Sequence, residues 1–369
     1  MRISIIGTRG IPNNYGGFEQ ITEQLSLGLA GYGHQVTVYC SDRHPYRQNE
    51  WNGVRLVHCY DPEGTIGTAG QFLYDLACLR HARKDRPDAL LFMGYTSSAI
   101  WWRLFPRCIV VSNMDGLEWM RSKYSPLVRR FLKYAEKLAV EHSHAHIADN
   151  RAIKSYLDEA YGIDSTFIPY AAEIRPDANS DHLTPYNLQP GDYYMLMARM
   201  EPENHVDMIL EGYVRSGSSK KMLVVGSTEN RYGHALQKKF AGSCVTFAGG
   251  LFDQAAVHSL RAFSALYFHG HSVGGTNPSL LEAMASKTLI AAHRNRFNRS
   301  VLGPDAFYFS EPAEVASIMQ TEEQEGNEEK IARNAGKIAT TYHWPGIVAQ
   351  YDALLLSKLK PHERAPHYA

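Results

Sequence analysis

The sequence predicts an α/β protein with two Rossmann-like domains, each built on a parallel sheet, and three observations carry this prediction. The chain has 369 residues, which is too long for one ordinary core and suits two domains. Short apolar runs alternate with helical stretches, as in βαβ units. The alternation is interrupted by a stretch rich in proline and polar residues and then restarts, which indicates a domain boundary.

The first half of the chain contains six apolar runs with the length expected of strands buried on both faces of a parallel sheet. These runs are residues 3–7, 35–40, 54–60, 89–95, 108–114 and 146–150. Helical spacing appears between the first two runs, at Phe18, Ile21, Leu25 and Leu29. This order predicts a strand–loop–helix–strand unit at the start of the chain.

The second half repeats the pattern. Its apolar runs are residues 193–199, 221–227, 244–251, 265–271 and 288–293. We therefore expect an N-terminal domain over 1–172, a linker over 173–191 and a C-terminal domain over 192–344. The remaining residues, 345–369, have the pattern of a terminal amphipathic helix.

Charge and cysteine content exclude several classes of protein. Lysine plus arginine and aspartate plus glutamate each total 38, so the net charge is near zero and composition gives no sign of nucleic-acid binding. The five cysteines are scattered without a CxxC pair, which argues against a zinc site or a disulfide framework. The first residues enter a strand pattern, and no apolar run is long enough to span a membrane, so we expect a cytoplasmic protein.

Three ordered motifs give the chain a resemblance to a known family. They are RGIPNNYGGFEQITEQLSLGLAGYGHQVTVYC, ARMEPENHVDMILEGY and GGTNPSLLEAMASKTLIAA. Together they resemble glycosyltransferase family 4, and most closely a bacterial rhamnosyltransferase-like branch that acts in capsule and O-antigen assembly. The resemblance implies the GT-B fold, with two Rossmann-like domains facing each other across a cleft. It also implies an N-terminal domain on the acceptor side, a C-terminal domain that binds a nucleotide sugar, and a last helix that packs back on the N-terminal domain.

A glycine loop follows the first predicted strand and opens a helix. Gly16 and Gly17 let the backbone approach a ligand, and a helix N-terminus offers N–H groups to an anion. The spacing differs from the GxGxxG of dinucleotide-binding proteins, which argues against a dehydrogenase. By the resemblance, Gly16 and Gly17 contact the donor phosphate, and Tyr15 and Phe18 lie on the acceptor side. A purely structural turn is the alternative.

Arg199 ends the first predicted strand of the second half, where ligands of open α/β sheets bind. An arginine can hold a diphosphate with two hydrogen bonds. The family pairs this arginine with a lysine five residues later, but Asn204 stands there in this chain. We expect Asn204 to donate at most one neutral hydrogen bond to the donor. A surface ion pair is the alternative role for Arg199.

The motif at 274–292 places Glu282 about one turn into a predicted helix capped by Asn277. The resemblance implies that the Glu282 carboxylate accepts hydrogen bonds from ribose. The family carries a second glutamate that contacts the sugar, and Gly274 occupies that position here. We therefore expect Gly275, Thr276 and Asn277 to contact the sugar and phosphate. A carboxylate that only complements the helix dipole is the alternative for Glu282.

The resemblance adds further candidates. Asp115 stands where the family has a histidine that contacts the donor sugar, and Glu118 is a neighbour on the acceptor side. Gly226 and Leu251 end strands near the expected nucleotide, and His271 follows a strand beside the phosphate loop. No metal site is expected. For each of these residues a role without ligand contact stays open.

The segment 119–137 is basic, amphipathic and rich in aromatic residues. Such a helix can rest on anionic lipid, and we expect peripheral contact with the inner face of the plasma membrane, near a lipid-linked acceptor. An ordinary helix with one solvated face is the alternative.

The sequence, with this resemblance, predicts a retaining glycosyltransferase that needs neither metal nor cofactor. The expected donor is a dTDP- or UDP-sugar, with rhamnose the first choice and a hexose the second. The acceptor would be a saccharide or a lipid-linked saccharide of bacterial surface polysaccharide assembly. Arg199, Glu282 and Asp115 are the predicted catalytic residues. The alternatives are a nucleotide-sugar 2-epimerase and a non-catalytic nucleotide-sugar-binding protein.

Overall fold

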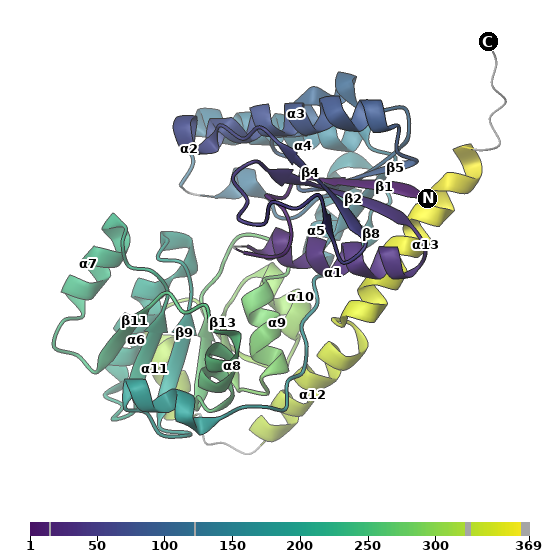
Figure 1. Cartoon of the computed structure of the whole chain (residues 1–369). Helices are drawn as coiled ribbons and strands as arrows, with labels where there is room; N and C mark the ends of the chain where they lie inside the picture. Colours follow the sequence, from purple (N-terminus) through teal and green to yellow (C-terminus); the bar gives the residue numbers. More distant parts are fainter. Residues whose placement is uncertain (15, 122, 322–325, 363–369) are drawn as a thin grey trace, which may run out of the picture. The chain divides into compact units, whose positions relative to one another are not determined.

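Figure 1 shows the computed structural model, which describes residues 1–14, 16–121, 123–321 and 326–362. The chain divides into two compact units. Unit 1 consists of Met1–Tyr170 and Trp344–Ala369, and unit 2 consists of Ala171–His343.

Unit 1 is built on an eight-stranded sheet with the strand order β3-β4-β2-β1-β5-β6-β7-β8. The strands are β1 Arg2–Ile6, β2 Gln35–Ser41, β3 Glu50–Trp51, β4 Val54–Cys59, β5 Ala89–Met93, β6 Ile109–Asn113, β7 Ala145–Ala148 and β8 Thr166–Phe167. Neighbours are parallel except β3 and β4. Every residue of β5 and β6 is buried, as expected for strands covered by helices on both faces.

The helices of unit 1 connect the parallel strands. They are α1 Gly17–Gly31, α2 Glu63–Ile66, η1 Gly67–Ala69, α3 Gly70–Asp85, η2 Ala99–Leu104, η3 Glu118–Met120, α4 Pro126–His142, α5 Arg151–Tyr161 and α13 Trp344–His362. Helix α13, yellow in Figure 1, packs on α1, where a Cβ on Gly28 would lie only 2.6 Å from Val348. The His34 ring and the Asp352 carboxylate also lie 2.7 Å apart there.

Unit 2 is built on a six-stranded parallel sheet with the order β11-β10-β9-β12-β13-β14. Its strands are β9 Tyr193–Met197, β10 Lys221–Val225, β11 Val245–Gly249, β12 Leu266–His269, β13 Ile290–His293 and β14 Phe307–Phe309. Its helices are η4 Ser180–Tyr186, η5 Pro202–Asn204, α6 Val206–Ser216, α7 Arg231–Lys239, α8 Gln254–Ala262, α9 Pro278–Ala285, α10 Arg296–Leu302, α11 Pro312–Gln320 and α12 Asn327–Thr340. A buried apolar cluster joins the sheet to α6 and α11.

Each apolar run identified in the sequence overlaps a strand of the structure. The sequence did not predict β3, β8 or β14, because these strands have only two or three residues. The structure divides after Tyr170, near the predicted end of the first domain at 172. The stretch 173–191 contains η4 and belongs to unit 2, where the Asn179 N–H donates to Ser259 Oγ at 3.0 Å.

Among the described residues, no helix combines the length and the apolar character needed to cross a membrane.

Candidate functional site

The candidate residues of unit 2 gather at the carboxyl ends of adjacent parallel strands. Arg199 follows β9, and the loop that leads into α9 follows β12, which pairs with β9 in parallel. The Arg199 side chain is 65% exposed, and its Nη1 lies 3.9 Å from Oε1 of Glu201. At that distance the ion pair is weak, so the guanidinium can turn toward a ligand.

Asn204 is buried and bridges two loops of this edge. Its Nδ2 donates to the Arg199 carbonyl oxygen at 2.7 Å, and its Oδ1 lies 2.9 Å from Nδ1 of His271. With 5% of its surface exposed, Asn204 uses its amide to hold the protein together. These two contacts let Asn204 position the loop that carries Arg199, while its Nδ2 has a second N–H. The hydrogen bond from Asn204 to the donor stays a prediction.

Glu282 lies in α9 and forms an ion pair with Arg261 of α8, with 2.8 Å between Nη2 and Oε2. The two side chains differ in exposure, at 2% for Arg261 and 28% for Glu282. The same Nη2 lies 3.0 Å from Ser279 Oγ and 3.1 Å from Met197 Sδ, while the buried Arg261 Nε has no hydrogen-bond partner among the described residues. This guanidinium fixes the position of the Glu282 carboxylate.

The N-terminus of α9 has the predicted cap. Asn277 Oδ1 accepts from Ser279 N–H at 2.9 Å, and a proline follows it. Gly274 has a φ of +136°, and a Cβ there would lie 2.9 Å from Nε2 of His271. The backbone therefore favours glycine at the position where the family has its glutamate. Gly275 and Thr276 complete the loop, and Thr276 is buried.

Gly226 and Leu251 follow β10 and β11 at the same edge. The Gly226 N–H donates to the Gly249 carbonyl at 2.7 Å, so this group is already engaged within the protein. At a φ of +147°, a Cβ on Gly226 would collide with the carbonyl oxygen of Ala198. Gly226 thus lets β10 approach the strand end that carries Arg199. Leu251 is half-buried.

Two histidines near this edge are kept neutral. Burial, with a smaller effect of Arg261, lowers the pKa of His269 to about 3. Burial and His205 lower the pKa of His293 to about 4. His271 lies 6.1 Å from His269 between ring centroids. Within the described residues, no group of three or more His, Cys, Asp or Glu is arranged to hold a metal ion.

The glycine loop of unit 1 opens α1 as predicted, with Gly16 at the N-cap and Gly17 as the first helical residue. The Glu19 carboxylate is buried at the edge of this loop and accepts from Arg9 N–H at 3.0 Å. A Cβ on Gly16 would collide with that carboxylate. The Phe18 ring lies beside Gly94, after β5. Tyr15 lies outside the described residues.

Asp115 follows β6, is half-buried and interacts with the buried Asp149. Tyr170 Oη donates to Asp115 Oδ2 at 3.2 Å. Burial raises the pKa of Asp115, while a hydrogen bond with Asp149 opposes the rise. Glu118 Oε1 lies 2.7 Å from Arg121 Nη2, so its charge is compensated locally. These contacts engage Asp115 and Glu118 with their own unit.

No motif in the sequence singles out Arg261. It lies in the segment QAAVHSLRA, where an arginine beside polar residues suggests a solvated position. The sequence feature that could have pointed to Arg261 is its position near the end of α8, shortly before the strand β12 that leads into the site.

A family model described as a domain of unknown function (DUF1972) matches residues 1–173. A comparison with curated proteins gave no match.

Solved structures are similar to the chain over nearly its whole length. Sucrose-phosphate synthase from Thermosynechococcus elongatus has a TM-score of 0.78 and 17% identity, with 98% of this chain and 99% of that chain covered. HepE from Anabaena, in complex with UDP, has a TM-score of 0.77 and 14% identity, with coverage of 97% and 100%. WaaG, a glycosyltransferase involved in lipopolysaccharide biosynthesis, has a TM-score of 0.71 and 14% identity, with coverage of 95% and 99%. The likeness establishes the fold, and the chain has the GT-B fold that its sequence predicted.

Proposed function

We propose that the protein is a retaining, metal-independent glycosyltransferase of family 4 that uses a nucleoside diphosphate sugar. The observation that carries the proposal is the buried Arg261 that fixes Glu282 at the strand edge where Arg199 also emerges. A fixed carboxylate suits the two ribose hydroxyls of a UDP-sugar or the single 3′-hydroxyl of a dTDP-sugar, and a loosely paired arginine suits a diphosphate. The similar HepE structures, solved with UDP and with UDP-glucose, support a nucleotide sugar as donor.

In the proposed reaction, the acceptor oxygen attacks the anomeric carbon on the same face from which the leaving group departs. The new C–O bond forms as the bond to the diphosphate breaks, and the departing phosphate takes the acceptor proton. Arg199 and the backbone N–H groups of the loop 274–277 stabilise the charge that develops on the diphosphate. No protein nucleophile is needed, and Asp115 is proposed as a polar group near the sugar.

We further propose a dTDP- or UDP-linked donor, with rhamnose or a hexose as the sugar, and an acceptor from bacterial surface polysaccharide assembly. The identity of the sugar is the least constrained part of this proposal, because Gly274 stands where glycosyltransferase family 4 has the carboxylate that contacts the sugar.

The direct test is a transfer assay with dTDP- and UDP-sugars in the presence of a chelator. We expect full activity with chelator and at least tenfold lower turnover for Arg199→Ala, of order 1.4 kcal/mol in barrier. Arg215→Ala is the matched control, because this arginine is exposed on α6. Complete loss with chelator contradicts the metal-independent mechanism, and wild-type turnover by Arg199→Ala contradicts the site.

Product analysis separates the alternatives. A 2-epimerase converts its sugar nucleotide without an acceptor, whereas the proposed transferase needs one. A non-catalytic binding protein would bind the nucleotide sugar and leave it unchanged in both conditions.

We also propose that α4 rests on anionic lipid. Leu127, Arg130, Tyr134 and Lys137 share one helical face, and Leu127 and Tyr134 are 76% and 55% exposed. Apolar and basic side chains on one exposed face match an anionic membrane surface. Not every cation of 119–137 takes part, because Lys133 Nζ lies 2.8 Å from the buried Glu136 carboxylate.

Vesicle sedimentation tests this surface. We expect wild-type protein to bind phosphatidylcholine vesicles that contain phosphatidylglycerol, and Leu127→Asp to bind them several-fold more weakly. Val214→Asp is the control, since Val214 of unit 2 is 52% exposed. Equal vesicle binding by Leu127→Asp and Val214→Asp would show that α4 does not form the membrane contact.

A further inference from the structure

Unit 1 contains a polar pocket of about 330 Å³ that involves none of the candidate donor residues. The pocket lies at the carboxyl ends of β1, β2 and β4, where Ser41 ends β2 and Arg9 and Asp61 follow β1 and β4. Ligands of open α/β sheets bind at this edge, and the volume lies in the range of small-molecule sites, roughly 300–1,000 Å³.

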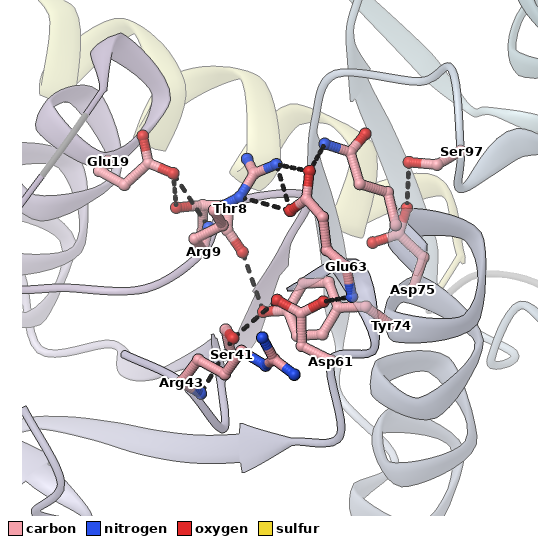
Figure 2. Close-up of polar contacts among 11 residues, drawn as sticks. Thr8, Arg9, Glu19, Ser41, Arg43, Asp61, Glu63, Tyr74, Asp75 and Ser97 are labelled. Carbon is pink, nitrogen blue, oxygen red and sulfur yellow. Dashed lines mark hydrogen bonds and ion pairs between the residues drawn. The ribbon is translucent and has the colours of Figure 1, made fainter. Parts of the chain in front are cut away.

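One wall of the pocket is a preformed arginine–carboxylate pair. The Arg9 Nε lies 2.9 Å from Oε2 of Glu63, and its Nη2 lies 2.7 Å from Oε1. Gln71 Nε2 donates to the same Oε1 at 3.1 Å. Figure 2 shows this pair at the centre of the polar network. The two parallel contacts fix the plane of the guanidinium before any ligand arrives.

The floor of the pocket consists of buried carboxylates that are held by the protein. Asp61 is 4% exposed and accepts from Ser41 Oγ at 2.7 Å and from the Glu63 N–H at 2.9 Å. Glu19 is 5% exposed and accepts from the Arg9 N–H at 3.0 Å. These hydrogen bonds, visible in Figure 2, leave further lone pairs on both carboxylates.

The position of Arg43, a second arginine that lines the pocket, depends on a glycine. Arg43 is exposed, and a Cβ added to Gly64 would overlap its guanidinium. Among the residues that the structure describes, the one hydrogen-bond partner of Arg43 Nη2 is Thr65 Oγ1, at a long 3.5 Å. Gly64 therefore leaves room for an arginine whose donors remain largely available to a ligand.

The chemistry of the lining selects the class of ligand. Three carboxylates, Glu19, Asp61 and Glu63, outnumber the guanidiniums of Arg9 and Arg43, which disfavours an anion. An apolar ligand could not use the donors of Arg43 or the remaining lone pairs of the carboxylates, and it would shield these groups from water. Saccharide hydroxyls both donate to carboxylates and accept from guanidiniums, so they match this mixture.

We propose that this pocket is a saccharide subsite that holds the acceptor through its hydroxyls. The hydroxyls donate to Asp61 and Glu63 and accept from Arg9 and Arg43. The assignment of the sugar as acceptor rests on the proposed function, whereas binding of the sugar itself does not.

The test uses a substitution confined to the pocket. Gly64→Ala displaces the Arg43 guanidinium. The φ of Gly64 is outside the left-handed region, so an alanine at this position fits the helix. Arg43→Ala removes the same group directly. Gly31→Ala is the matched control, because it lies in a helix of the same unit with no atom near the added Cβ.

Saccharide binding is measured by ligand-observed NMR with free glucose, galactose, mannose, rhamnose and N-acetylglucosamine, and with glucuronate and inorganic phosphate as anionic probes. We expect at least one neutral sugar to bind wild-type protein and Gly31→Ala, and to bind Gly64→Ala and Arg43→Ala at least tenfold more weakly. Absence of binding by every neutral sugar, equal binding by all four proteins, or preference for an anion would overturn the proposal.

Binding of UDP, measured in parallel, separates this proposal from the proposed function. Gly64→Ala should bind UDP like the wild type. If no protein binds a nucleotide while the neutral sugar still binds the pocket, the proposed function fails and the subsite remains.

Discussion

The Arg261 guanidinium lies 2.8 Å from the Glu282 carboxylate, and the arginine is almost completely buried while the glutamate is not. The exposures are 2% and 28%. A buried charge without a partner costs far more free energy than one that water can reach. Arg261 therefore depends on the ion pair more than Glu282 does, because water can partly hydrate the Glu282 carboxylate but not the buried guanidinium.

Glu282→Gln should destabilise unit 2 more than Arg261→Met does. The first change leaves a buried guanidinium without a counter-charge, which costs about 3–5 kcal/mol when a buried pair is broken. The second leaves a carboxylate that remains partly hydrated. Urea unfolding measures both, and the double variant should recover most of the loss. Equal destabilisation by the two single variants would show that the burial of Arg261 does not govern the pair.

Arg261→Lys and Arg261→Met should change ribose recognition without contact between Arg261 and the ligand. Arg261→Met should weaken UDP binding about tenfold and reduce the preference for UDP over 2′-deoxy-UDP, since a hydrogen bond to a charged group contributes about 1.5–3 kcal/mol. Arg261→Lys should retain part of the preference. Titration calorimetry on each variant gives the ratio of the two affinities. An unchanged ratio in Arg261→Met would leave Arg261 a purely structural role.

Asn204→Lys should not restore the lysine that the family uses. Asn204 is buried, and a lysine there loses the hydrogen bonds to Arg199 and His271 while it introduces a charge. We expect a lower melting temperature and lower turnover. Gln189→Lys, at an exposed position of unit 2, is the control for added charge. Wild-type stability with raised turnover would contradict the positioning role of Asn204.

Gly274→Glu should likewise fail to recover the family's carboxylate. The backbone has a φ of +136° at Gly274, and the new Cβ would press on His271. We predict loss of stability for both Gly274→Glu and Gly274→Ala, because the strain comes from the Cβ and not from the charge. Thermal unfolding decides this, and a stable Gly274→Ala would refute it.

Asp75 should make the stability of unit 1 depend on pH. Burial raises its pKa to about 7, and Ser97 Oγ donates to its carboxylate at 2.6 Å (Figure 2). The folded protein then binds a proton that the unfolded chain has released, so the free energy of unfolding should fall as pH rises from about 4 to about 7. The slope is at most about 1.4 kcal/mol per pH unit.

Urea midpoints across that range compare wild type with Asp75→Asn, in which this dependence should disappear. Asp164→Asn is the control, because the Asp164 side chain is fully exposed. Parallel pH profiles for wild type and Asp75→Asn would contradict a protonated Asp75.

The sheets of both units could be predicted because their strands are buried on both faces. In β5 and β6 every residue is buried, and an unbroken apolar run is the direct consequence. The strand β14 could not be predicted, because its three residues, Phe307–Phe309, are too few to show a hydrophobic pattern.

The site could be predicted only in part. Arg199 and Asn277 were recognisable because a strand end and a helix cap have local signatures. The role of Asn204 and the burial of Arg261 were not recognisable, because both depend on partners 67 and 21 residues away in the chain. Contacts of that kind exist only in the folded sheet.

The central claim, that the strand edge of unit 2 binds a nucleoside diphosphate through Arg199 and Glu282, is tested most directly by titration calorimetry with UDP and dTDP. We predict that at least one of them binds wild-type protein and Arg215→Ala equally, and binds Arg199→Ala and Glu282→Ala at least tenfold more weakly while circular dichroism shows both variants folded. Absence of binding by both nucleotides, or undiminished binding by folded Arg199→Ala and Glu282→Ala, would contradict the account.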